Sequence, residues 1–201
     1  MLLAPGLRMR PMRSPGSFFF ALVLAAMSLV APATRAAPPD LDVKVQMIGD
    51  EIRAQVSLFV RASRQHAWEV LTDYERAPQF TPDLLVSKIV RRSGDTLRLF
   101  QKTRVRWGPF SLPVETLSDI RLSAPERTET RLVRGAMDKY ESVTELIPEA
   151  GGTRILYRSH AVPGSGLAQF AGESLVKRET EEHFRQLRAE ILRREPLASQ
   201  Q

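Results

Sequence analysis

The stretch AWEVLTDYERAPQFTPDL, residues 67–84, decides the fold of this chain. Four of its residues share one face of a helix, at the spacing of an amphipathic segment: Ala67, Trp68, Leu71 and Tyr74. Ser63 precedes them and has a side chain that can cap the start of this helix. Pro78 and Pro82 end the helix and force a bent connection, because proline has no backbone N–H and restricts the residue before it. We therefore predict a short helix, with a second short helical turn near residues 79–80.

On both sides of this stretch, apolar residues alternate with polar ones, which is the pattern of half-buried strands. Two strands are expected before the helix, at residues 41–48 and 52–60. Six more are expected after it, at residues 86–92, 96–107, 114–123, 127–134, 138–147 and 153–161. Short turn signals separate most of these segments, so antiparallel hairpins are the simplest arrangement. A long helix at residues 167–194 closes the chain, with an apolar stripe formed by Val176, Phe184, Leu187 and Ile191.

The first 36 residues have the composition of a secretory signal peptide. Three basic residues open the chain: Arg8, Arg10 and Arg13. The apolar run that follows, residues 18–30, is short for a membrane-spanning helix. We expect cleavage near Ala36/Ala37 and a periplasmic or secreted protein; an uncleaved N-terminal anchor is the alternative. Residues 37–201 then form one domain, with order expected over residues 41–195.

Charge and cysteine content narrow the classes of function. The chain has 29 Lys and Arg residues against 23 Asp and Glu residues, and four of the arginines lie before residue 37. The remaining domain therefore has 25 basic and 23 acidic side chains, a small net charge that gives no indication of nucleic-acid binding. Cysteine is absent, so thiol chemistry is excluded and the exported domain is expected to be held together by packing alone.

Alternation along the strands collects polar but uncharged side chains on one face, opposite the charged residues. This predicted inner face contains Gln101, Thr103, Thr116, Ser118, Tyr140, Ser142, Thr144, Tyr157 and Ser159. A buried hydroxyl or amide without a partner costs about 1 to 3 kcal/mol. So many polar groups are more easily accommodated if they line a cavity that holds water or a ligand. Bulges, or local bonds between these side chains and the backbone, are the alternative.

Residues 67–84 resemble the first helical segment of the START-like (SRPBCC) superfamily, which includes polyketide cyclases and coenzyme Q-binding proteins. The predicted order of elements is similar to the α+β helix-grip fold, in which a curved antiparallel sheet wraps a long C-terminal helix around an internal cavity. The resemblance covers nearly all of residues 37–201 and implies that the cavity holds one apolar molecule. The coenzyme Q-binding relatives, and not the composition, point to an isoprenoid quinone.

Residues that carry chemistry are sparse. His66, His160 and His183 have no spacing that would form a metal site, and we expect all three on surfaces. The chain also lacks a glycine-rich phosphate loop, a nucleophile elbow and a dinucleotide fingerprint. We therefore predict no metal, no cofactor and no assigned catalytic residue, and the oligomeric state stays open.

The entrance of the predicted cavity is assigned to four aromatic residues: Tyr74, Phe80, Trp107 and Phe110. Aromatic side chains on loops are suited to contact with a ligand or a membrane. Three acidic residues lie in the same region: Asp73, Glu75 and Asp83. Two of them could act as an acid–base pair, or they could form caps and salt bridges, for example with Arg76.

Three interpretations of function follow. The first is an exported START-like protein that binds a lipid, an isoprenoid quinone or a similar hydrophobic molecule for carriage or sequestration, with transient membrane contact and no nucleic acid. The second is a cyclase or aromatase that acts on a polyketide-like substrate through Tyr140, Tyr157 or an acid near the entrance. The third is an interaction module whose groove is filled by its own side chains. We favour the first, a non-enzymatic role.

Overall fold

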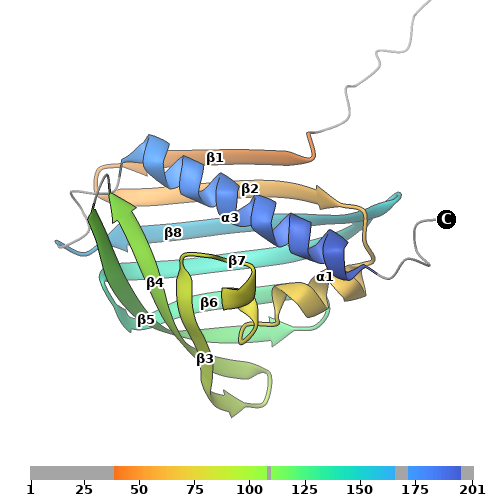
Figure 1. The fold of residues 1–201 in the computed structure, drawn as a ribbon, viewed down its shortest axis with the longest axis horizontal. Helices are drawn as coiled ribbons and strands as arrows, with labels where there is room; N and C mark the ends of the chain where they lie inside the picture. The colour runs from red at the N-terminus through yellow and green to blue at the C-terminus, as the bar shows by residue number, and fades with distance from the viewer. Residues whose placement is uncertain (1–38, 108–109, 166–171, 196–201) are drawn as a thin grey trace, which may run out of the picture. The chain divides into compact units, whose positions relative to one another are not determined.

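Eight strands pair in one antiparallel sheet, in the order β1-β2-β8-β7-β6-β5-β4-β3 (Figure 1). The computed structural model describes residues 39–107, 110–165 and 172–195. The strands are β1 (Leu41–Ile48), β2 (Glu51–Val60), β3 (Leu84–Ser93), β4 (Thr96–Trp107), β5 (Phe110–Ser123), β6 (Arg127–Gly135), β7 (Met137–Glu149) and β8 (Gly152–Pro163). Each corresponds to a strand expected from the sequence. The largest difference is at β5, which begins four residues early because its ladder with β4 continues to the pair Trp107–Phe110.

The helical segment between β2 and β3 is shorter than predicted. Helix α1 (Arg64–Leu71) is capped by the Ser63 hydroxyl, which accepts the His66 N–H at 3.1 Å. Both the N–H and the hydroxyl of Thr72 bond to the Trp68 carbonyl, which closes the helix. Tyr74 therefore lies beyond α1, contrary to the prediction. The second helical turn is η1 (Ala77–Gln79).

The C-terminal helix α3 (Glu173–Arg194) lies across the sheet (Figure 1). The start predicted for it, at residue 167, falls outside the described residues. Residues 1–38, with the predicted signal peptide, also fall outside them. No helix in the described part of the chain is long and apolar enough to cross a membrane.

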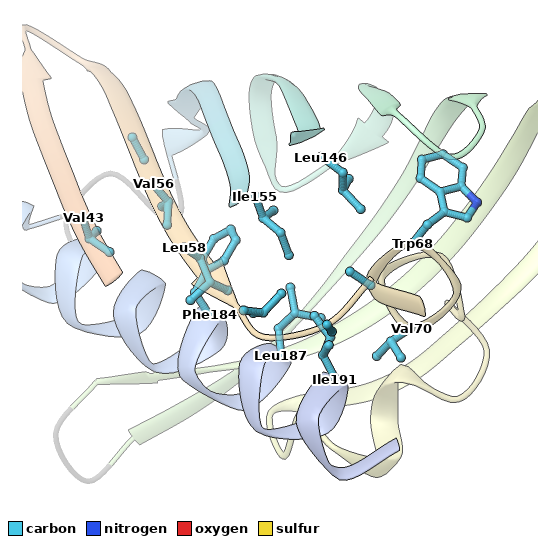
Figure 2. Packing of buried hydrophobic residues seen from close by; sticks show 14 of the residues in the cluster. Val43, Val56, Leu58, Trp68, Val70, Leu146, Ile155, Phe184, Leu187 and Ile191 are labelled. Atoms are coloured by element: carbon cyan, nitrogen blue, oxygen red, sulfur yellow. The ribbon is translucent and has the colours of Figure 1, made fainter. Parts of the chain in front are cut away.

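The main hydrophobic core lies between α3 and the half of the sheet formed by β1, β2 and β8 (Figure 2). The predicted stripe is confirmed, since Phe184, Leu187 and Ile191 are all less than 5% exposed. They pack in one cluster with Leu58 and Ile155, which are both fully buried. Burying such a side chain stabilises the fold by about 1.5 to 3 kcal/mol each.

A second and smaller cluster lies on the other half of the sheet, at Leu97, Leu99 and Ile120. The elements that α3 contacts most are β1, β2 and α1. One helix therefore covers one half of the inner face, and the inner face of β4 to β6 lies beyond the reach of its apolar stripe. This arrangement leaves room between the two clusters.

A network of ion pairs fastens the segment after α1 to the end of α3. Arg194 approaches Asp73 at 2.6 Å and Glu190 at 2.6 Å. Arg193 also pairs with Glu190, and Arg76 pairs with Asp73, both at 2.7 Å. Hydrogen bonds from Arg193 and Arg194 lower the pKa of Glu190 to about 2, although burial acts in the opposite direction. The network holds the segment that follows α1 against the rest of the fold.

We expect Glu190→Gln to lower the free energy of unfolding by about 1 to 3 kcal/mol at pH 7. Glu190 has a lower pKa in the folded chain than its ordinary 4.5. Its contribution is therefore fully present above about pH 4.5 and is lost as the pH falls toward 2. Urea unfolding of both proteins at pH 7, 4.5 and 2.5 measures the difference. Glu182→Gln, at an exposed carboxylate of the same helix, is the matched control. A pH-independent difference would contradict the assignment.

Candidate functional site

The inner face of the sheet and α3 enclose a cavity with two adjoining lobes. The outer lobe has a volume of about 570 Å³ and the inner lobe a volume of about 400 Å³. Residues shared by their walls include Tyr140, Tyr157, His183 and Leu187. Both volumes exceed about 300 Å³, the lower end for small-molecule sites. The cavity therefore argues against the interpretation that the groove is filled by its own side chains.

Eight of the nine polar residues assigned to the cavity line its inner lobe: Gln101, Thr103, Thr116, Ser118, Tyr140, Ser142, Thr144 and Tyr157. The exception is Ser159, which is not in the described lining of either lobe and lies opposite Ser142 in the ladder. Strand β6 adds Thr128 and Thr130, which the sequence analysis missed because β6 was not divided into faces. Alternation along β6 would have identified them, because residues 128 and 130 share one face of the strand. In the ladder, Thr128 lies opposite Thr144 and Thr130 opposite Ser142. That these residues bind a ligand stays a prediction.

Two phenols meet at the junction of the lobes. The hydroxyl oxygens of Tyr140 on β7 and Tyr157 on β8 lie 2.9 Å apart. Burial raises the pKa of Tyr157 well above 10, and the adjacent Tyr140 adds to this, while hydrogen bonds with Ser159 and Ser142 act against it. Tyr157 is therefore a neutral phenol at physiological pH. The two hydroxyl groups carry two protons, and the hydrogen bond between them uses one. The other O–H group can therefore donate a hydrogen bond to a third group.

His183 is exposed on the long helix, as predicted, and it also lines both lobes of the cavity, which was not predicted. Its ring lies edge-on to Phe184 at 5.5 Å. Burial lowers the pKa of His183 below 6.5, so the neutral imidazole dominates at neutral pH. Helical spacing could have identified it, because His183 lies seven residues after Val176 and four before Leu187.

The other two histidines lie away from the cavity. His160 is on the outer face, as expected, with its Nε2 at 3.0 Å from Glu51. His66 is not on the surface as predicted, because its side chain is only 15% exposed. Its Nε2 lies 2.9 Å from the Ile191 carbonyl oxygen and 3.3 Å from Glu195, so it joins α1 to the end of α3.

The two lobes differ in charge. The described lining of the inner lobe contains no Asp, Glu, Lys or Arg. The outer lobe is bordered by five charged residues: Asp83, Arg104, Arg106, Glu179 and Glu182. The expectation that the cavity wall would contain almost no charge therefore holds for the inner lobe and is wrong for the outer lobe. The outer charges come from the end of β4, from α3 and from Asp83, directly before β3.

The predicted entrance aromatics have separate places. Tyr74 and Phe80 line the inner lobe, and burial raises the pKa of Tyr74 above its ordinary value. The Arg194 guanidinium lies over the Phe80 ring at 5.5 Å, so the ion-pair network also holds this part of the wall. Trp107 and Phe110 pair at the ends of β4 and β5. Their side chains lie outside the described part of the chain, and their role in the entrance stays a prediction.

The three acids of this region form no acid–base pair. Asp73 belongs to the ion-pair network with Arg76 and Arg194, which is the salt-bridge alternative. Asp83 borders the outer lobe and lies 2.8 Å from Arg106. Glu75 accepts the Ile89 N–H at 3.4 Å. Among the residues with a described position, no group of His, Asp and Glu could hold a metal ion. The geometry provides a cavity that is partly apolar, with neutral hydrogen-bond donors in its wall.

Comparisons with known proteins identify the family. Residues 60–186, well over half of the chain, match the family described as polyketide cyclase / dehydrase and lipid transport. Among curated proteins, none matches the chain.

Solved structures share the fold at low sequence identity. The STAR-related lipid transfer protein from Xanthomonas axonopodis has a TM-score of 0.62 and 16% identity, over 78% of this chain and 96% of that one. The Zhui aromatase/cyclase from Streptomyces sp. R1128 has a TM-score of 0.62 and 14% identity, over 74% and 98%. A START superfamily protein from Mycobacterium smegmatis has a TM-score of 0.57 and 17% identity, over 70% and 97%. With its eight-stranded sheet, long C-terminal helix and internal cavity, the chain belongs to the polyketide cyclase / dehydrase and lipid transport family.

Proposed function

We propose that this protein binds one uncharged hydrophobic molecule in the cavity, for carriage or sequestration. The observation that carries the proposal is the inner lobe of about 400 Å³, in whose described lining hydroxyl, amide and apolar groups occur without Asp, Glu, Lys or Arg. An anionic headgroup placed there would lose its hydration without gaining a cation, which is costly. A lipid, an isoprenoid quinone or a similar molecule with a few neutral oxygen atoms meets no such penalty.

The tyrosine pair supports the proposal, because it offers a hydrogen-bond donor to such a ligand. The donatable proton of the Tyr140–Tyr157 pair, 2.9 Å from oxygen to oxygen, suits a carbonyl or hydroxyl oxygen of the ligand. The Leu187 side chain and the face of α3 then meet the apolar part of the molecule. A quinone carbonyl is one acceptor of this kind, and the resemblance to coenzyme Q-binding proteins is the reason to include quinones among the candidates.

A cyclase or aromatase is the second candidate. One observation favours it, because the neutral imidazole of His183 faces the same cavity as the tyrosine pair and can accept a proton. The similarity to the Zhui aromatase/cyclase concerns the fold alone, at 14% identity. Formation of a cyclised product from a polyketide-like chain by the purified protein would establish this activity.

We also propose that residues 1–36 direct export of the protein, as their basic start and apolar run suggest. N-terminal sequencing of the protein from the periplasmic fraction of its host is expected to give a chain that begins at or near Ala37. Recovery of the intact N-terminus in a membrane fraction would support the anchor instead. Recovery of the intact chain in the cytosol would overturn the proposed export.

The ligand proposal is tested by native mass spectrometry of the protein purified from its host, followed by lipid extraction. We expect a co-purifying apolar molecule at near one-to-one. Ser118→Leu, which adds volume to the inner lobe, is expected to reduce the bound fraction at least tenfold. Ser111→Leu, on an exposed position of the same strand, is the matched control. A ligand-free mass, with no uptake from a panel of quinones and phospholipids, would refute carriage.

Removal of either phenol hydroxyl tests the polar contact. Tyr140→Phe and Tyr157→Phe should each weaken binding of a ketone or quinone ligand about three- to tenfold, the value of one lost hydrogen bond. Binding of a hydrocarbon of matched size should change by less than twofold, because no oxygen is available to accept the bond. Fluorescence competition with the two ligands measures both affinities. Equal losses for the ketone and the hydrocarbon would indicate a packing defect instead.

A further inference from the structure

The outer face of strands β3 to β6 carries apolar side chains where a solvated sheet face normally has polar ones. The strand register aligns Lys88, Phe100, Leu117 and Arg134 in one row across the four strands. Phe100 alternates with Leu99 and Gln101, which face the interior, so its ring is on the outer side. Val86 is on the same side, opposite Lys102, and is 40% exposed. We call Val86, Lys88, Phe100, Leu117 and Arg134 the outer patch.

Bulges add to the exposed apolar surface near the outer patch. Val90 and Val133 are the extra residues where the ladder slips by one position, and they are 50% and 45% exposed. An extra residue in a bulge has no partner on the neighbouring strand. Its aliphatic side chain is therefore available for contact with something outside the chain.

Most of the cations without an ion-pair partner lie on the same strands as the outer patch; Arg92 is on the inner side of the sheet, because it lies opposite the buried Leu97. Across the described residues, eight Lys and Arg side chains form no ion pair: Arg61, Lys88, Arg91, Arg92, Arg104, Arg131, Arg134 and Lys177. Six of the eight lie on β3, β4 or β6. The two acids at the centre of the outer face, Glu115 and Asp119, are each already paired, with Lys102 and Arg98. The domain has almost balanced charge, but this half of it has a local positive excess.

We propose that the outer patch is a docking surface for an anionic lipid bilayer. Cations without an ion-pair partner next to exposed valines and the partly exposed Phe100 match a surface with negative headgroups above an apolar layer. The face ends at the cavity, because Arg104 belongs both to it and to the border of the outer lobe. Docking would therefore bring the cavity entrance close to the bilayer. The proposal does not depend on what the cavity binds.

A bilayer fits these observations better than an acidic protein. In the aligned row, Phe100 and Leu117 lie between the cations Lys88 and Arg134, and none of these four residues lines a described cavity. A protein partner needs shaped pockets for its anchoring side chains. A fluid surface of headgroups needs only charge and accessible apolar area.

The absence of cysteine allows one dye to be placed at one position of the full chain. Val86→Cys, labelled with an environment-sensitive fluorophore, reports from the outer patch. Gln55→Cys, an exposed position on the outer side of β2, is the matched control. With vesicles of phosphatidylcholine and phosphatidylglycerol at 7:3, roughly the charge that attracts basic segments, we expect a blue shift at Val86 and none at Gln55. No shift at Val86, or equal shifts at the two positions, overturns the proposal.

The second measurement is the vesicle partition coefficient of variants that lack cations of the outer patch. Lys88→Gln combined with Arg134→Gln should lower the vesicle partition coefficient about 25-fold, or about fivefold for each cation near the surface. Arg61→Gln combined with Lys177→Gln removes two cations that are equally without partners but lie elsewhere, and should change partition less than about twofold. Because residues 1–36 are common to all these proteins, their own affinity for vesicles cancels in the comparison. Equal losses in the two double variants overturn the proposal.

Discussion

One helix has to bury its apolar stripe against a sheet that is much wider than the helix. Helix α3 buries this stripe, formed by Phe184, Leu187 and Ile191, on the half of the sheet that consists of β1, β2 and β8. There the stripe packs with Leu58 and Ile155. A sheet of eight strands spans about 33 Å between its edge strands, whereas a helix with its side chains is about 10 Å across. The other half of the inner face therefore has no helix to pack against. The cavity is the consequence of this mismatch in width.

The uncovered half of the face could have been closed by larger apolar side chains, and in this chain it is not. Thr116, Ser118, Ser142 and Thr144 are small and polar, so they leave space and they supply hydrogen-bonding groups to whatever occupies it. Holding such a face open costs stability compared with a filled core. The ion-pair network at Arg194 offsets part of this cost, because it secures the wall segment that contains Tyr74 and Phe80.

Most of the fold could be predicted from the sequence, because alternation with a period of two runs along most of each strand and is interrupted only at bulges such as those at Val90 and Val133. The inner lobe could be predicted for the same reason, since a residue such as Ser118 keeps its face wherever the strand curves. What alternation cannot give is the position of elements that are distant in sequence. The approach of Asp73 to Arg194, 121 residues later, and the place of His66 under the end of α3 depend on how two helices meet. His183 was missed for another reason, because polar residues on a helix are usually assigned to solvent.

Charged side chains are distributed unevenly over the surfaces of this one sheet. Its inner face at β4 to β6 holds neutral polar groups, its border at the outer lobe holds charges of both signs, and its outer face at β3 to β6 holds cations without partners. A strand alternates sides at each residue, so a single strand can serve all three surfaces. In β4, Gln101 and Thr103 line the inner lobe, Arg104 borders the outer lobe, and Phe100 points outward. The period of two that builds the sheet is thus also what separates a neutral binding space from a charged exterior.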